Sequence, residues 1–268
     1  MRRTLSGLIY LLSALIGVAA FVYPFLLPRL PVADGDAAYL AEAPLLTTVL
    51  LALCLVALLV EMQGEVVSAK VIAALGVLVA LTSVLRFMET AIPGPGGFSP
   101  IFAPIILAGY VFGARFGFLM GALTLLVSAL LTGGLGPWLP YQMFVAAWVG
   151  FTAGWLPNLQ HRPRLELTLL VLFSVVWGML FGVITNLYFW PFFVGESGMA
   201  WQPGAGVRTA LAHYTAFYGT TSFLWDVVRA AGNGALMLVL GRPAIRALAR
   251  FRDRFHFTVV TKEAYGEG

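Results

Sequence analysis

The sequence has few charged residues, few lysines and a single cysteine. Only 10% of its 268 residues are charged, whereas soluble globular domains carry about 25%. Hydrophobic residues make up 60% of the chain, and the mean hydropathy is +0.91. These proportions exclude a soluble globular fold, because too few polar residues are present to solvate its surface. Cys54 has no second cysteine to pair with, so a disulfide-stabilised scaffold is excluded too.

Sequence motifs of the common catalytic chemistries are also missing. The chain contains no G-x-x-x-x-G-K-[ST] pattern, and its only lysines are Lys70 and Lys262, so it has no P-loop. The H-E-x-x-H and G-x-S-x-G patterns are absent as well, and the three histidines lie far apart. We therefore expect a protein that is not an enzyme and that binds neither a metal nor a cofactor.

Long apolar runs are what the sequence has instead. Several reach the roughly 20 residues that a helix needs to cross the hydrocarbon core of a bilayer. Eight candidate spans, of which the fourth and fifth are short, lie near residues 6–27, 44–61, 68–87, 100–114, 116–132, 140–157, 167–192 and 219–241. The expected fold is therefore all-α, a polytopic transmembrane helical bundle. Residues 208–218 are expected to form a separate, half-buried segment before the last span.

Basic residues gather on one side of these segments. They comprise Arg2, Arg3, Lys70, Arg115, Arg162, Arg164 and the five arginines at 242, 246, 250, 252 and 254, with Arg29, Arg86 and Arg208 as exceptions. By the positive-inside rule, both termini are expected in the cytoplasm of a bacterial cell, with the protein in its plasma membrane. This pattern accounts for the net charge of +4 without nucleic-acid binding.

The two ends of the chain each leave an alternative open. The N-terminal arginines, apolar stretch and small residues at 18–20 also fit a cleaved signal peptide, although the apolar stretch is longer than such signals use. Residues 243–257 alternate arginine and apolar side chains at helical spacing, which indicates an amphipathic helix on the cytoplasmic membrane surface. Docking of a partner protein is the alternative for that tail.

Two runs of small residues suggest close helix packing. The first is Ala69, Ala73, Gly76 and Ala80 in the third span, and the second is Gly109, Gly113, Gly117 and Gly121 in GYVFGARFGFLMG. In lipid, helices associate through close backbone approach, which small residues permit. The first run is expected to dock a partner subunit. Packing inside the bundle is the alternative for both runs.

The predicted outward loops combine aromatic side chains with glycine and proline. Interface aromatics usually anchor helices at headgroup depth, but rigid Gly-Pro frames also favour preset π faces for a planar or bulky organic ligand. Polar residues at the outer ends of the spans would orient that ligand. The candidate ligand-binding residues are Phe98, Trp138, Tyr141, Gln142, Asn186, Trp190, His213 and Tyr214. In the last span, Asp226 and Arg229 are expected to pair with each other, with a ligand role as the alternative.

Residues 100–154, PIFAPIILAGYVFGARFGFLMGALTLLVSALLTGGLGPWLPYQMFVAAWVGFTAG, resemble the substrate-binding membrane subunits (S components) of energy-coupling factor (ECF) vitamin transporters. The stretch from Gly113 to Gly117 is similar to the cytoplasmic turn of that family, and Ala69 and Ala73 match its A-x-x-x-A face. The resemblance implies a six-helix substrate-binding core at 66–245. Residues 1–65 would then be a two-helix transmembrane extension, and 246–268 a cytoplasmic amphipathic tail.

The same resemblance implies the function and the partners. The chain would capture a vitamin or its precursor from outside, with a cobalamin-like ligand as the first candidate and a thiamin-like one as the second. It would work with a transmembrane scaffold subunit and two cytoplasmic ATPases, and Trp138, Tyr141 and Gln142 would line the pocket. The alternative is a self-contained secondary transporter of a small organic solute, but the sequence shows neither inverted repeats nor an acidic cluster.

Overall fold

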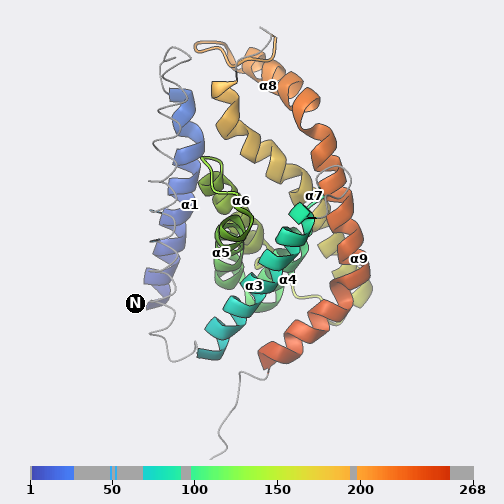
Figure 1. The fold of residues 1–268 in the computed structure, drawn as a ribbon. Coiled ribbons are helices and arrows are strands. Elements are labelled where there is room, and N and C mark those ends of the chain that lie inside the picture. Colours follow the sequence, from blue (N-terminus) through green and yellow to red (C-terminus); the bar gives the residue numbers. More distant parts are fainter. Residues whose placement is uncertain are drawn as a thin grey trace, which may run out of the picture.

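The computed structural model describes residues 2–26, 69–91, 98–193 and 198–253, together with the single positions 49 and 52. In this part of the chain every regular element is a helix, which confirms the expected all-α bundle (Figure 1). The helices are α1 (Arg2–Leu26), α3 (Ala69–Ala91), α4 (Phe102–Phe112), α5 (Ala114–Thr132), α6 (Leu139–Ala153), α7 (Pro163–Phe189), α8 (Val207–Thr221) and α9 (Phe223–Asp253), with a 3₁₀ turn, η2 (Trp190–Phe192), after α7. Apart from positions 49 and 52, the expected span at 44–61 lies outside the described residues.

Four of the described helices, α3, α5, α7 and α9, are long and apolar enough to cross a membrane. The separate segment expected before the last span is α8. The bounds expected for that span, 219–241, are wrong, because α9 begins at Phe223 and continues with Pro243 inside it to Asp253. Tertiary contacts hold the added turns: Ile245 is buried, and Arg252 Nη1 donates a hydrogen bond to the Val111 carbonyl oxygen of α4 (3.2 Å).

A seam of glycines holds α4, α5 and α6 together, backbone against backbone. A β-carbon on Gly150 of α6 would lie 2.0 Å from the carbonyl oxygen of Gly117 in α5, and one on Gly109 of α4 would lie 2.1 Å from that of Gly150. Gly121 approaches the Ala146 carbonyl equally closely. Only residues without a side chain allow this approach. For the glycine run in α4 and α5, internal packing is therefore the correct alternative.

A single residue, Gly113, connects α4 to α5. Its φ of 97° lies in the left-handed half of the Ramachandran map, which residues with a β-carbon rarely adopt. The backbone N–H of Gly113 donates to the Gly109 carbonyl (2.9 Å) and so closes the last turn of α4. Gly113 thus forms a tight turn at the start of the Gly113–Gly117 stretch.

The basic loops meet at one end of the bundle, which we call the basic end. The contact of Arg252 with Val111 brings the last turn of α9 to the connection that precedes Arg115. Tyr110, near the end of α4, donates a hydrogen bond to Glu166 Oε1 (2.7 Å) in the first turn of α7. The first residues of α1 lie at this end as well (Figure 1).

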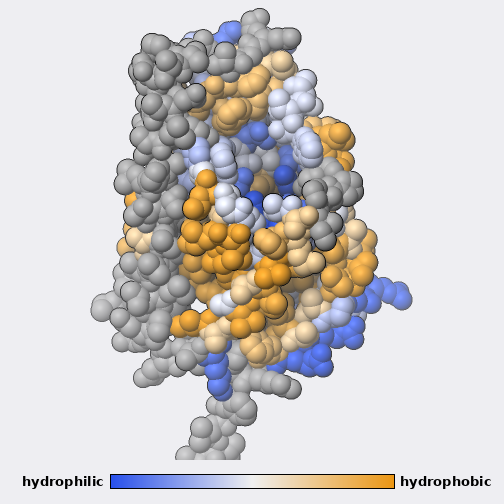
Figure 2. Space-filling view, viewed as in Figure 1, coloured by the Kyte–Doolittle hydropathy of each residue, from blue (hydrophilic) through white to orange (hydrophobic). Residues whose placement is uncertain are grey.

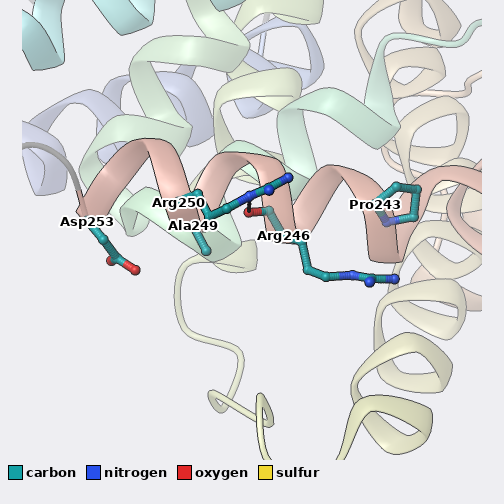
Figure 3. A pocket seen from close by; sticks show the side chains of 5 residues that line it. All are labelled: Pro243, Arg246, Ala249, Arg250 and Asp253. Atoms are coloured by element: carbon teal, nitrogen blue, oxygen red, sulfur yellow. Dashed lines mark hydrogen bonds between the residues drawn. The ribbon is translucent and has the colours of Figure 1, made fainter.

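A groove of about 460 Å³ opens beside the last turns of α9 at the basic end (Figure 3). Its lining residues are Pro243, Arg246, Ala249, Arg250 and Asp253. Arg250 Nε donates a hydrogen bond to the Arg246 carbonyl oxygen (3.2 Å), so this arginine is held along its own helix.

Candidate functional site

Aromatic rings pack together at the end of the bundle opposite the basic end. We call five of these rings the aromatic cluster: Tyr141 of α6, Tyr188 of α7, Trp190 of η2, Trp201 of the loop before α8, and Tyr214 of α8. Tyr141 and Tyr188 are stacked, with ring centroids 4.4 Å apart and planes 14° apart. Trp190 meets Trp201 and Tyr214 edge to face, at 5.2 and 5.0 Å. Both are geometries that the ring quadrupole favours.

The N-terminal helix contributes two further rings to this end. Phe21 of α1 lies edge to face with Tyr141, with centroids 5.2 Å apart. Phe25, one turn later, lies edge to face with Trp201 at 5.1 Å and is 5.9 Å from Trp190. The sequence analysis did not find these residues, and their spacing of four in an apolar run was the only signal that they share a face.

Hydrogen bonds hold the loop between η2 and α8 against the aromatic cluster. Trp190 Nε1 donates to the Met199 carbonyl oxygen (2.8 Å). Nδ1 of His213 lies 2.9 Å from the Ala200 carbonyl oxygen. These two contacts fix the backbone just before Trp201, so the loop presents its tryptophan in a defined position.

A group of polar residues, which we call the polar cluster, lies beside the aromatic cluster between α7, α8 and α9. Its members are Asn186, Tyr218, Ser222, Asp226 and Arg229. Ser222 Oγ donates to Asn186 Oδ1 (3.1 Å), and the Tyr218 hydroxyl donates to Asp226 Oδ2 (2.8 Å). Asp226 is only 1% exposed and forms an ion pair with Arg229, which confirms the expected pairing. Charges within a span are costly unless they are paired in this way.

Residues of α7 form the surroundings of this ion pair. A β-carbon on Gly182 would lie 1.7 Å from Asp226 Oδ2, so the missing side chain makes room for the carboxylate. The guanidinium of Arg229 lies 5.4 Å from the centre of the Phe181 ring, a cation–π contact. The Tyr214 hydroxyl donates to the Val183 carbonyl oxygen, and burial, followed by the charge of Asp226, raises the pKa of this phenol.

Helix α3 brings a second pair of opposite charges to the polar cluster. Arg86 and Glu89 interact electrostatically with each other and with Arg229, and Ser99 Oγ donates to Glu89 Oε2 (2.7 Å). Glu89 lies beyond the expected end of the third span, 68–87, and that end is wrong, because α3 continues to Ala91. The hydropathy of the sequence falls at Arg86, but a fall in hydropathy does not end a helix. The first residue that disfavours a helix is Pro93, which comes two residues after the end of α3.

Figure 2 shows a hollow on this face of the protein, in front of α7 and between α1 and α9. Hydrophilic residues lie inside the hollow, and hydrophobic side chains cover the surface below it. Two of the helices that carry the polar cluster, α7 and α9, border this hollow. An aromatic cluster beside a polar cluster can bind a ring system: the aromatic side chains stack on the ring, and the polar side chains fix its orientation by hydrogen bonds.

The remaining sequence-predicted residues lie outside these two clusters. Phe98 packs on α9, where a β-carbon on Gly232 would lie 2.2 Å from Phe98 Cδ2. Trp138 is 41% exposed and covers Gly136. Gln142 follows Tyr141 in α6 and is half-buried. The structure thus brings five of the eight candidates together, namely Tyr141, Asn186, Trp190, His213 and Tyr214.

Asn233 of α9 fixes the connection that follows Phe98. Its Nδ2 donates to the Ser99 carbonyl oxygen (2.9 Å), and its Oδ1 accepts a hydrogen bond from the backbone N–H of Ala103 (3.3 Å). Asn233 therefore ties the first turn of α4 to α9 close to the polar cluster.

The candidate docking run on α3 faces outward in the structure. Ala73, Gly76 and Ala80 are exposed, and nothing lies within 4 Å of a β-carbon built on Gly76. The side chain of Ala69, at the start of α3, is outside the described residues. We call Ala73, Gly76 and Ala80 the small-residue face.

Comparison with known proteins gives one match. Neither the curated proteins nor the solved structures gave a match to this chain. The family model described as "ECF transporter, substrate-specific component" matches residues 70–241. These residues run from α3 into α9 and include every residue of the aromatic cluster and of the polar cluster. The chain belongs to the family of substrate-specific components of ECF transporters.

Proposed function

We propose that this chain captures a vitamin or a vitamin precursor on the outer side of the bacterial plasma membrane. The observation that carries the proposal is the aromatic cluster beside the polar cluster, at the end of the bundle opposite the basic end. Arginine-rich ends of membrane proteins face the cytoplasm. With that orientation both termini are cytoplasmic and the two clusters open to the outside.

Two ligand classes suit the clusters. A cobalamin-like ligand is the first candidate, because a bulky corrinoid would use the wide array of aromatic rings. A thiamin-like ligand or pyrimidine precursor is the second, because Asn186 and Tyr218 offer amide and phenol groups to the edge of a small heteroaromatic ring. Identifying the small molecule that copurifies with the full-length chain, by mass spectrometry, tests both. A corrinoid would support the first candidate and a pyrimidine the second, whereas a ligand without a ring system would contradict the proposal.

The partners follow from the family. A transmembrane scaffold subunit and two cytoplasmic ATPases would supply the energy, and the small-residue face of α3 would dock the scaffold. The rival function, a self-contained secondary transporter, gains support from one observation, namely that Glu89 and Asp226 both approach Arg229. Uptake by proteoliposomes that contain this chain alone, driven by an ion gradient, would favour that rival.

We expect Trp190→Ala to weaken binding of the copurifying molecule by about 1–3 kcal/mol, which is roughly tenfold to a hundredfold in Kd. The indole is buried, contacts three other rings and anchors the loop through Met199. The measurement is ligand titration of the purified variant. Trp155→Ala is the control, because that side chain is 66% exposed near the basic end. Equal losses of affinity in Trp190→Ala and Trp155→Ala would contradict the assignment of Trp190 to the ligand site. Trp138→Ala, titrated in the same way, tests whether that exposed ring also contacts the ligand.

We expect Ala73→Leu combined with Ala80→Leu to leave ligand binding intact and to weaken assembly with the scaffold subunit at least about tenfold. Leucines on the small-residue face hold the two backbones apart, so the dispersion contacts between them are lost. Copurification with the coexpressed scaffold and ATPases measures assembly. Ala231→Leu with Ala235→Leu adds the same bulk to the exposed side of α9. Normal assembly of the α3 variant would exclude this face as the docking surface.

A further inference from the structure

Helix α1 lies outside the residues that match the family model, yet it is packed into the bundle along its length. Near the basic end, Tyr10 lies edge to face with Phe118, at 5.2 Å, and is stacked on Phe151. In the middle, a β-carbon on Gly17 would lie 2.7 Å from both Phe144 and Trp148 of α6. A helix that served only as a membrane anchor would need no such close approach.

The two sides of α1 differ in what they contact. Tyr10, Gly17 and Phe21 are spaced i, i+7 and i+11, which places them on one face of the helix, and Tyr10 and Phe21 are buried there. The other side carries exposed apolar residues suited to lipid, namely Leu8, Leu11, Leu15, Val18 and Val22. The inward face therefore has the character of a core helix, and it ends at the aromatic cluster.

At that end, the rings of α1 touch the rings that the proposed ligand would stack on. Phe21 packs edge to face against Tyr141, which in turn is stacked on Tyr188. Phe25 lies against Trp201 and Trp190. Aromatic pairs hold one another at defined angles. Moving α1 would therefore remove the support of the Tyr141–Tyr188 stack and of the Trp190–Trp201 pair at the same time.

We propose that α1 is a wall of the ligand site, added to the family core, in which Phe21 positions Tyr141 and Phe25 closes the site beside Trp190 and Trp201. With this wall the site has aromatic rings from α1, α6, α7, η2 and the loop before α8, an arrangement suited to a planar ring system. The inference rests on the proposed function, since it assigns to α1 a part in binding the same ligand. The fixed contact at Gly17 holds the wall in register with α6.

A pair of glycine variants tests the wall. Gly17→Leu wedges α1 away from α6, whereas Gly7→Leu adds the same bulk to the same helix where nothing lies within 4 Å. The probe is thiamin or cyanocobalamin, whichever the unaltered full-length protein binds, and native mass spectrometry measures its loading. We expect Gly17→Leu to raise the Kd about tenfold or more and Gly7→Leu to leave it unchanged.

The outcomes separate this inference from the proposed function. If both glycine variants load normally while Trp190→Ala does not, α1 is not a wall, although the aromatic cluster remains the ligand site. If Trp190→Ala also loads normally, the aromatic cluster is not the site and both proposals fail.

A double-mutant cycle covers the case in which Gly17→Leu fails to fold. Phe21→Ala, Tyr141→Ala and the double variant are titrated with the same probe, and Leu15→Ala, on the lipid-facing side of α1, is the control. If Phe21 acts through Tyr141, the double variant binds no worse than Tyr141→Ala alone. If shortening any side chain of α1 disturbs the structure, Leu15→Ala will also unfold at a lower temperature. If the losses of affinity in Phe21→Ala and Tyr141→Ala add up in the double variant, Phe21 does not act through Tyr141 and the positioning role is overturned.

Discussion

Gly150→Ala is expected to destabilise the bundle strongly. The new β-carbon would lie 2.0 Å from the carbonyl oxygen of Gly117 and 2.4 Å from its carbonyl carbon, and both belong to the backbone of α5. Flexible side chains can move aside for an added methyl group, but a packed helix backbone cannot. Overpacking of cores typically costs about 1–3 kcal/mol, and we expect this clash to cost at least about 3 kcal/mol. The measurements are the monodisperse yield after size exclusion in detergent and the unfolding temperature.

The same substitution elsewhere provides the control. Gly76→Ala also adds one methyl group in a helix, but on the exposed side of α3, where nothing lies within 4 Å. Alanine favours the helix over glycine by up to about 1 kcal/mol, so this variant should be as stable as the unaltered protein or more so. If Gly150→Ala unfolded at the same temperature as Gly76→Ala, the backbone seam between α5 and α6 would be ruled out.

Asp226→Ala is expected to destabilise the ligand-free protein by about 3–5 kcal/mol, because removing one partner of a buried ion pair leaves the other charge uncompensated. We expect the lower end of this range, since Glu89 also interacts with Arg229. The Tyr218 hydroxyl would lose its acceptor as well. Thermal unfolding without added ligand is the measurement, so that any role of Asp226 in binding does not enter the result.

Two further variants show whether the loss of stability in Asp226→Ala comes from the broken ion pair. Combining Asp226→Leu with Arg229→Leu removes both charges and should recover much of the stability, as replacing a buried pair by apolar side chains often does. Leu224→Ala, at a 70% exposed position of the same helix, should have little effect. If Asp226→Ala kept full stability but lost binding, the carboxylate would face the ligand and the ion pair would not be structural.

Much of the fold could be predicted from hydropathy and turn residues. The one-residue connection at Gly113, the separate helix α8 and the Asp226–Arg229 pair all follow from local sequence. The ends of α3 and α9 could not, because hydropathy reports the apolar stretch and not the last hydrogen-bonded turn. Both helices continue into charged sequence, where tertiary contacts such as that of Arg252 hold them.

The candidate site was only partly predictable, for a different reason. Aromatics beside proline or just after a glycine-rich loop stand out in the sequence, so Trp190, which precedes Pro191, and Tyr214, which follows the loop at 198–206, were found. Phe21, Phe25 and Tyr188 lie in apolar runs, where a ring that faces lipid and a ring that faces a ligand have the same neighbours in the sequence. The glycine runs posed the same difficulty, since spacing shows which residues share a face but not what that face contacts.

The connection at Gly113 leaves the chain no slack where α4 meets α5. One residue added in the first turn of α5 would rotate the rest of that helix by about 100°. Gly117 and Gly121 would then turn away from α6, and bulkier neighbours would take their places. The register of α5 is thus set by its contact with α6, so an insertion within the first turn of α5 is excluded even though that turn lies at the end of the bundle.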